Sequence, residues 1–184
     1  SEEFKHPIPH TLKNKAFKDF LKKEYREDFY TKGIEVLKKN ADIIRSVFPT
    51  FLKLQEVWGF KVFPTYTVKL TKYGPGGSYN SDTGEIIMLT TVDGDFKQLY
   101  PVDTVIHESV HIGIEDIIVK KYHLSHTEKE RLVDLMCRDL FQDTLKDCRL
   151  QSIGDSKVNP FITGKMDVYN LPTQIEKYIE KNPR

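Results

Sequence analysis

The chain has 184 residues, of which 39% are hydrophobic and 30% are charged, a balance typical of one ordinary soluble domain. Its formal net charge of +1 gives no electrostatic reason to expect a nucleic-acid partner, and apolar runs such as 117–119 are far too short to cross a bilayer. The two cysteines, Cys137 and Cys148, exclude a disulfide framework. On one continuous helix they would lie roughly 16 Å apart, so we expect free thiols.

The N-terminal third has a helical pattern. Residues 11–24 place apolar side chains on one side of a helix, and their lysines alternate with acidic residues, which indicates a solvated outer face. A second helix is expected over 29–47 and a short third one over 50–57. We therefore expect residues 1–60 to pack against the core and cover it.

The hydrophobic period changes from helical to alternating after residue 60. Apolar residues alternate with threonine and lysine within 62–71, which predicts a half-buried strand. The glycine-rich segment 74–77 breaks this pattern. Two further strands are expected at 78–80 and 85–91, joined by a turn at 81–84.

Helical patterns return with Pro101. This proline suits the first position of a helix that should run to about Tyr122. Ser125 and Glu128 have the spacing of a capping box, which predicts the start of a second helix over about 126–147.

The order of elements predicts an α+β domain. We expect one domain with a helical part at 1–60, a sheet and two central helices in 61–150, and a C-terminal tail at 151–184. Within the tail, 154–170 has a loop-like composition and 172–181 is expected to be a last helix.

The helix expected from Pro101 contains an H-E-x-x-H motif at residues 107–111. His107 and His111 are four residues apart and share one helix face, where two imidazoles can bind one Zn²⁺ ion. Glu108 points to the side of the site where a metal-bound water would lie, and it is the expected catalytic base. The apolar neighbours of the motif predict a buried helix, in which polar groups need partners such as a metal. The alternative is a chance match, with histidines held by ordinary hydrogen bonds.

A catalytic zinc ion needs a third protein ligand, and four later carboxylates are candidates. Glu115 lies too far along the same helix, and Glu128 is explained by the capping box. Glu130 and Asp134 lie four residues apart on the apolar side of the next helix, where carboxylates are costly unless they are paired or ligating. If the helices pack side by side, Glu130 reaches the zinc and Asp134 accepts a hydrogen bond from His107. The alternative places both carboxylates on a solvated edge.

These residues together resemble the gluzincins, the thermolysin-like branch of the zincin metallopeptidases. That family has a glutamate ligand on the helix after its motif and a supporting aspartate four residues later, the spacing of Glu130 and Asp134. The resemblance covers about residues 78–141. It implies a zincin-like fold with a small mixed sheet, an active-site helix and a following glutamate-ligand helix. It also implies that 85–91 is a strand whose exposed edge binds the substrate as an added strand.

Single residues exclude two related families. The metzincin extension of the motif requires a glycine and a histidine where this chain has Ile114 and Ile117. Peptide deformylases take a cysteine ligand upstream of the motif, and no cysteine precedes Cys137.

Thermolysin-like enzymes stabilise the oxyanion with a tyrosine and a histidine beyond the motif. Tyr122 lies at a comparable distance after the motif, and we assign it as the expected catalytic donor. His123 and His126 could instead approach the cleft from the turn between the helices, although exposed loop histidines are the simpler reading. Tyr169 and Arg131 are weaker options.

The sequence therefore predicts a zinc-dependent endopeptidase. It would hydrolyse peptide bonds of peptide or protein substrates with metal-activated water. One alternative is an inactive or latent zinc-binding protein whose cleft is filled by a terminal segment. Another is a helical interaction module with an accidental motif. The compartment and the oligomeric state stay open: no signal peptide is visible, and a targeting segment already removed would be compatible with secretion or the cell envelope.

Overall fold

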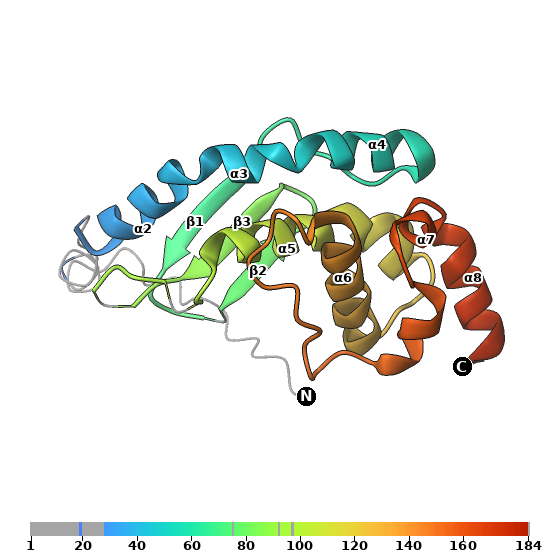
Figure 1. The fold of residues 1–184 in the computed structure, drawn as a ribbon. Helices are drawn as coiled ribbons and strands as arrows, with labels where there is room; N and C mark the ends of the chain where they lie inside the picture. The colour runs from blue at the N-terminus through green and yellow to red at the C-terminus, as the bar shows by residue number, and fades with distance from the viewer. Residues whose placement is uncertain (1–18, 20–27, 75, 92, 97, 184) are drawn as a thin grey trace.

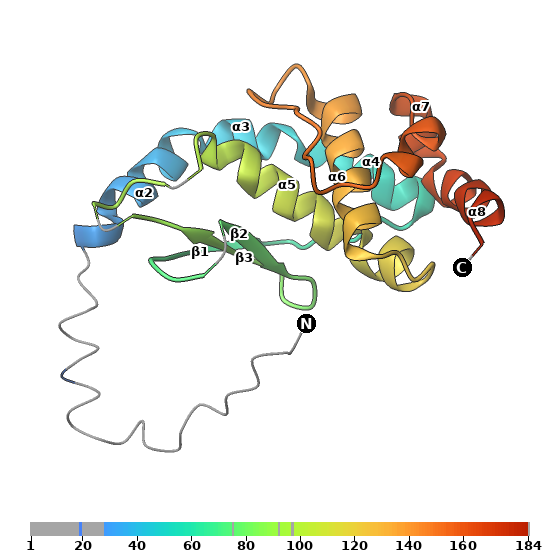
Figure 2. The ribbon, with the colours of Figure 1, turned by 90° about the horizontal axis from the view of Figure 1, so that it is seen from below.

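The computed structural model describes Asp19 and residues 28–74, 76–91, 93–96 and 98–183. The helix expected over 11–24 lies outside the described residues, apart from Asp19. The described part combines a three-stranded sheet with a larger set of helices, so the α+β class is confirmed. Figures 1 and 2 show the first helices end to end along one side, the sheet beside α5, and the last helices at the far end.

The described N-terminal region contains three helices in place of the two expected over 29–47 and 50–57. They are α2 (Asp28–Lys39), α3 (Ala41–Ser46) and α4 (Phe48–Trp58). The helix expected over 29–47 is interrupted at Asn40, whose side-chain amide donates to the carbonyl of Val36 at 2.8 Å. This side-chain bond offers the backbone an alternative to continuing the helix. The short helix expected over 50–57 is confirmed as α4, which ends at Gly59 with φ 86°.

The sheet has the strand order β1-β3-β2, formed by β1 (Thr67–Thr71), β2 (Gly77–Asn80) and β3 (Glu85–Leu89). Thr67 of β1 lies opposite Glu85 in a parallel pair, and Tyr79 of β2 lies opposite Ile86 in an antiparallel pair. β3 is therefore the central strand, and the expectation that 85–91 offers an exposed edge is wrong. Within the described sheet, β2 is an edge strand beside α5.

The first strand begins later than predicted because Pro64 lies within 62–71. Proline lacks a backbone N–H and cannot donate to a strand ladder, and β1 starts only at Thr67. Within β1 the predicted alternation holds, since Val68 and Leu70 are half-buried while Lys69 is exposed.

α5 (Pro101–Ile114) begins at Pro101 as predicted. It continues as a π-helix, η1 (Glu115–Lys120), instead of remaining an α-helix to Tyr122. The segment EDIIVK has three charged and three apolar residues, a pattern that does not distinguish a π-helix from a continued α-helix.

α6 (His126–Phe141) begins with the predicted capping box. The Glu128 amide donates to Ser125 Oγ at 3.3 Å, and the Ser125 amide donates to Glu128 Oε2 at 2.6 Å. The helix ends at Phe141, six residues before the expected end at 147. After the helix, the carboxylate of Asp103 in α5 accepts hydrogen bonds from the backbone N–H groups of residues 146 and 147, at 2.8 Å each. These bonds draw the chain back toward α5.

The C-terminal tail has more regular structure than its composition suggested. It contains the 3-10 helix η2 (Ser156–Phe161) and the helices α7 (Lys165–Tyr169) and α8 (Leu171–Lys181). α8 confirms the helix expected over 172–181, whereas the loop expected over 154–170 is wrong. Buried Val158 and Val168 anchor this segment in the core, a tertiary effect that composition does not reveal.

Two apolar clusters hold α5 in place. The larger one joins α5 to α4, α6 and α8, and the smaller one joins Val105 and Ile112 of α5 to Ile86 and Met88 of β3. Both cysteines are free, as expected. No helix in the described part of the chain is long and apolar enough to cross a membrane.

Candidate metal centre

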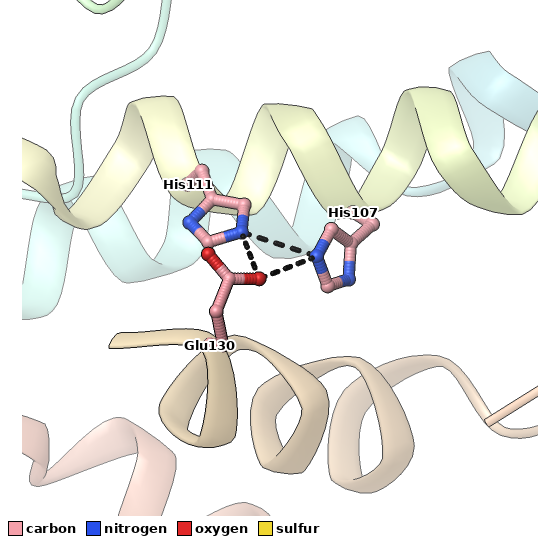
Figure 3. Close-up of side chains that lie close together, drawn as sticks. All are labelled: His107, His111 and Glu130. Carbon is pink, nitrogen blue, oxygen red and sulfur yellow. Dashed lines mark hydrogen bonds and ion pairs between the residues drawn. The ribbon is translucent and has the colours of Figure 1, made fainter. Parts of the chain in front are cut away.

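Three side chains from two helices converge on one point, as Figure 3 shows. His107 and His111 come from successive turns of α5, and Glu130 comes from the facing side of α6. The Nε2 atoms of the two histidines are 3.1 Å apart. Glu130 Oε2 lies 3.7 Å from His107 Nε2 and 3.4 Å from His111 Nε2. The structure thus brings together the three residues that the sequence predicted as ligands.

The separations of these three atoms fit a tetrahedral metal ion. Bonds of about 2.0–2.1 Å place neighbouring ligand atoms about 3.3 Å apart, and the measured separations of 3.1, 3.4 and 3.7 Å bracket that value. His107, His111 and Glu130 can therefore hold a metal ion. Three protein ligands leave a fourth tetrahedral position open for water or substrate.

Protonation of the ligand group follows from burial and from the close contacts. His111 is only 2% exposed, and burial lowers its pKa to about 4, so its ring is neutral. Burial acts to raise the pKa of Glu130, but its close contacts with the two histidines outweigh burial and lower that pKa. For His107, burial acts to lower the pKa, whereas contacts with Cys137 and Glu130 raise it to about 10. A metal ion bound here would displace a proton from His107.

His111 is oriented by packing. Its buried Nδ1 has no hydrogen-bond partner among the described residues. Its ring stacks on Tyr79 of β2 with centroids 5.0 Å apart and planes 9° apart. The edge strand thus fixes the plane of one candidate ligand.

Glu108 lies beside the ligand group, between α5 and β2. A Cβ atom at Gly77 would lie 2.4 Å from Glu108 Oε1, so the strand backbone passes directly over the carboxylate. Burial raises the pKa of Glu108 to about 7. The residue predicted as the base therefore lines the same pocket as the three ligand residues.

Asp134 is near His107 but does not accept the predicted hydrogen bond. Its Oδ1 is 3.9 Å from His107 Nδ1, beyond hydrogen-bond distance. Asp134 instead accepts the backbone amide of Gln151 at 2.7 Å and the side-chain amide of Gln151 at 3.0 Å. The carboxylate is held by the segment after α6, and its relation to His107 is electrostatic.

Tyr122 is not placed for the predicted oxyanion role. Its hydroxyl donates to Glu176 of α8 at 2.8 Å, and Tyr122 is not among the described residues that line the pocket. The chain turns after η1 and carries this side chain toward α8. The structure therefore gives no support to the assignment of Tyr122 as a catalytic donor.

Of the other options for that role, only His126 reaches the pocket. Its Nδ1 lies 3.5 Å from Glu130 Oε1, and its side chain is 64% exposed. His123, Tyr169 and Arg131 are not found among the described pocket-lining residues. Arg131 donates to the carbonyls of Gln151 and Gly154, which gives it a structural role.

The pocket around these residues has a volume of about 1040 Å³ and is bounded by β2, α5, α6 and the segment after α6. Among the lining residues that sequence reasoning did not single out are Tyr79 and Lys129. Tyr79 fell in an expected strand, but no local signal placed that strand against the motif helix. Lys129 directly precedes Glu130, and its position next to a candidate ligand was the one available signal.

No protein-family model, curated protein or solved structure matches this chain. Conclusions about function therefore depend on the geometry and chemistry of the pocket.

Proposed function

We propose that this chain is a zinc-dependent peptidase of the gluzincin type. The observation that carries the proposal is the convergence of His107 Nε2, His111 Nε2 and Glu130 Oε2 at tetrahedral spacing. Two imidazoles and one carboxylate with an open fourth position are a common ligand set of catalytic zinc. The tetrahedral spacing favours zinc, because metal selectivity at such sites is set by geometry and ligand type rather than by raw affinity.

The proposed reaction divides between the metal and the side chains of the pocket. Zinc, when bound, supplies a Lewis acid that polarises the carbonyl and activates water at neutral pH. Glu108 accepts a proton from the attacking water as the O–C bond forms. Glu108 then gives this proton to the leaving nitrogen as the C–N bond breaks. Burial of Glu108 between α5 and β2 keeps bulk water from competing for the proton.

The edge strand β2 supports a peptide as the substrate class. Gly77, Ser78, Tyr79 and Asn80 all line the pocket, and β2 is paired with β3 along only one of its sides in the described sheet. An extended peptide can therefore add to β2 as a further strand, with its backbone held by strand hydrogen bonds. In this proposal β2 has the substrate-binding role that the sequence had suggested for 85–91.

The test compares zinc-loaded wild type with Glu108→Gln on a broad peptide library. We expect the wild type to cleave, and Glu108→Gln to keep its zinc but lose activity by about 10²–10⁴-fold, the usual contribution of a positioned general base. Glu56→Gln, at an exposed glutamate of α4, is the matched control and should behave as wild type. Full activity in Glu108→Gln would remove Glu108 as the base. A zinc-loaded wild type that cleaves nothing would support the alternative, a latent zinc-binding protein.

A further inference from the structure

A hydrogen-bonded pair, Tyr79 and Lys129, forms part of the pocket wall beside the ligand group. Lys129 of α6 donates from Nζ to the Tyr79 hydroxyl at 2.8 Å. The Tyr79 hydroxyl in turn donates to Glu115 Oε2 at 2.6 Å. The phenol proton is therefore already engaged by Glu115.

The ammonium group of Lys129, in contrast, has donors to spare. An ammonium has three N–H donors, and among the described residues the Lys129 ammonium makes a hydrogen bond only to Tyr79. Lys129 is half-buried and lines the pocket, so its remaining donors can reach a bound molecule. It is the cation of this pair that can contact substrate.

The position of the ammonium is tied to the ligand group through Tyr79. The Tyr79 ring that it contacts stacks on His111 at 5.0 Å. Lys129 also lines the same pocket as Glu130. The Lys129 charge is thus held on the pocket wall shared by β2 and α6, next to the ring that packs on His111.

We propose that Lys129 is a catalytic residue that stabilises the oxyanion, and that Tyr79 is a positioning residue that holds its ammonium in place. The inference rests on the proposed peptidase function. When water adds to the scissile carbonyl, negative charge develops on the carbonyl oxygen, and a Lys129 N–H donates a hydrogen bond to it. No bond to Lys129 breaks, and the charge disappears when the C–N bond breaks and the amine leaves with the proton from Glu108. Lys129 thereby takes the role that the sequence had assigned to Tyr122.

Kinetic comparison of three variants tests this role. Lys129→Met removes the charge at similar length, and we expect kcat to fall by about 10²–10³-fold with KM and zinc content unchanged. Lys129→Arg restores a cation and should recover part of the loss. Tyr79→Phe keeps the ring stacked on His111 but releases the ammonium, so its kcat should fall less than that of Lys129→Met. Lys53→Met, at an exposed lysine of α4, is the control.

A binding measurement provides a readout besides turnover. A peptidyl phosphonamidate carries anionic oxygens where the oxyanion would form, and calorimetry on the zinc-loaded proteins gives its Kd. We expect Lys129→Met to bind it about 10²-fold more weakly than wild type, with Lys129→Arg in between. Equal affinities of wild type and Lys129→Met, or equal kcat values at full zinc content, would overturn the inference. If wild type cleaves no peptide, the proposed function fails, and the affinity comparison still decides whether Lys129 binds the anion.

Discussion

The candidate ligands are oriented by contacts of different kinds. His111 is fixed by the Tyr79 ring against its face, while Glu130 is held by the two histidines it faces. His107 has Asp134 behind it at 3.9 Å, close enough for electrostatic attraction although too far for a hydrogen bond. Metal affinity should therefore depend on packing of β2 as well as on the ligands themselves.

The close packing of Gly77 on Glu108 provides a prediction at the residue scale. An added Cβ at Gly77 would lie 2.4 Å from Glu108 Oε1 and 2.9 Å from Thr104 Cγ2, so Gly77→Ala must displace the carboxylate. We expect kcat to fall by about 10²-fold, as for other small misplacements of catalytic groups, while zinc content stays at the wild-type level. Steady-state kinetics together with metal analysis check this outcome.

The neighbouring glycine is the matched control. A Cβ at Gly76 meets only the end of the flexible Gln98 side chain, at 2.4 Å from Nε2, which can move aside. Gly76→Ala should therefore keep most of the activity. Similar losses in the two variants would show that the strand, and not the position of Glu108, limits turnover.

At the scale of elements, α5 is positioned by an aromatic ring packed on its backbone. The Phe60 ring lies over Gly113, where an added Cβ would come within 1.9 Å of Phe60 Cζ. Lys61 then donates its amide to the Gly113 carbonyl at 2.9 Å. The segment after α4 thus fixes α5 two residues beyond the second histidine of the motif.

Gly113→Ala tests this contact. The fully buried Phe60 ring has little room to move, so overpacking should lower the free energy of unfolding by about 3 kcal/mol. Urea unfolding followed by circular dichroism measures the change. Gly164→Ala is the control, because no atom of the described residues beyond its two chain neighbours lies within 4 Å of its added Cβ, and it should change stability by less than about 0.5 kcal/mol. A loss below about 1 kcal/mol in Gly113→Ala would contradict the packing argument.

Elements with local signals were predictable from sequence, and their spatial relations were not. Pro101 and the Ser125–Glu128 capping box marked helix starts because proline and capping side chains act within one helical turn. The i, i+4 spacing of the histidines and the apolar side of α6 were enough to identify the three residues that converge. Strand order depends on pairing between distant segments, so the edge position of β2 was missed. Tyr122 was misplaced because its partner, Glu176, lies 54 residues further along the chain.

At the scale of the whole molecule, the ligand group joins two helices that also meet at the core. α5 supplies two candidate ligands and packs on the sheet, while α6 supplies the third and packs on the C-terminal helices through the larger apolar cluster. A metal ion at this junction would connect both parts of the fold. Because unfolding separates the three ligands, metal binding should stabilise the native state.

Removal of the metal tests this coupling. With free zinc at about 100 times its Kd, the native state gains about 2.7 kcal/mol, which raises Tm by about 5–10 °C for a chain of this length. We expect differential scanning calorimetry to show this shift between protein treated with a chelator and protein reloaded with zinc. Glu130→Ala should lose most of the shift. An equal shift in Glu130→Ala would place the stabilising metal elsewhere.

The most direct test of the metal centre is the metal content of the purified chain, measured by inductively coupled plasma mass spectrometry after equilibration with zinc and dialysis. Wild type and His107→Ala are compared, and circular dichroism establishes that the variant is folded. The proposed site predicts about one zinc ion per chain in wild type and almost none in His107→Ala. A wild type without metal, or a folded His107→Ala that holds as much zinc as wild type, would contradict it.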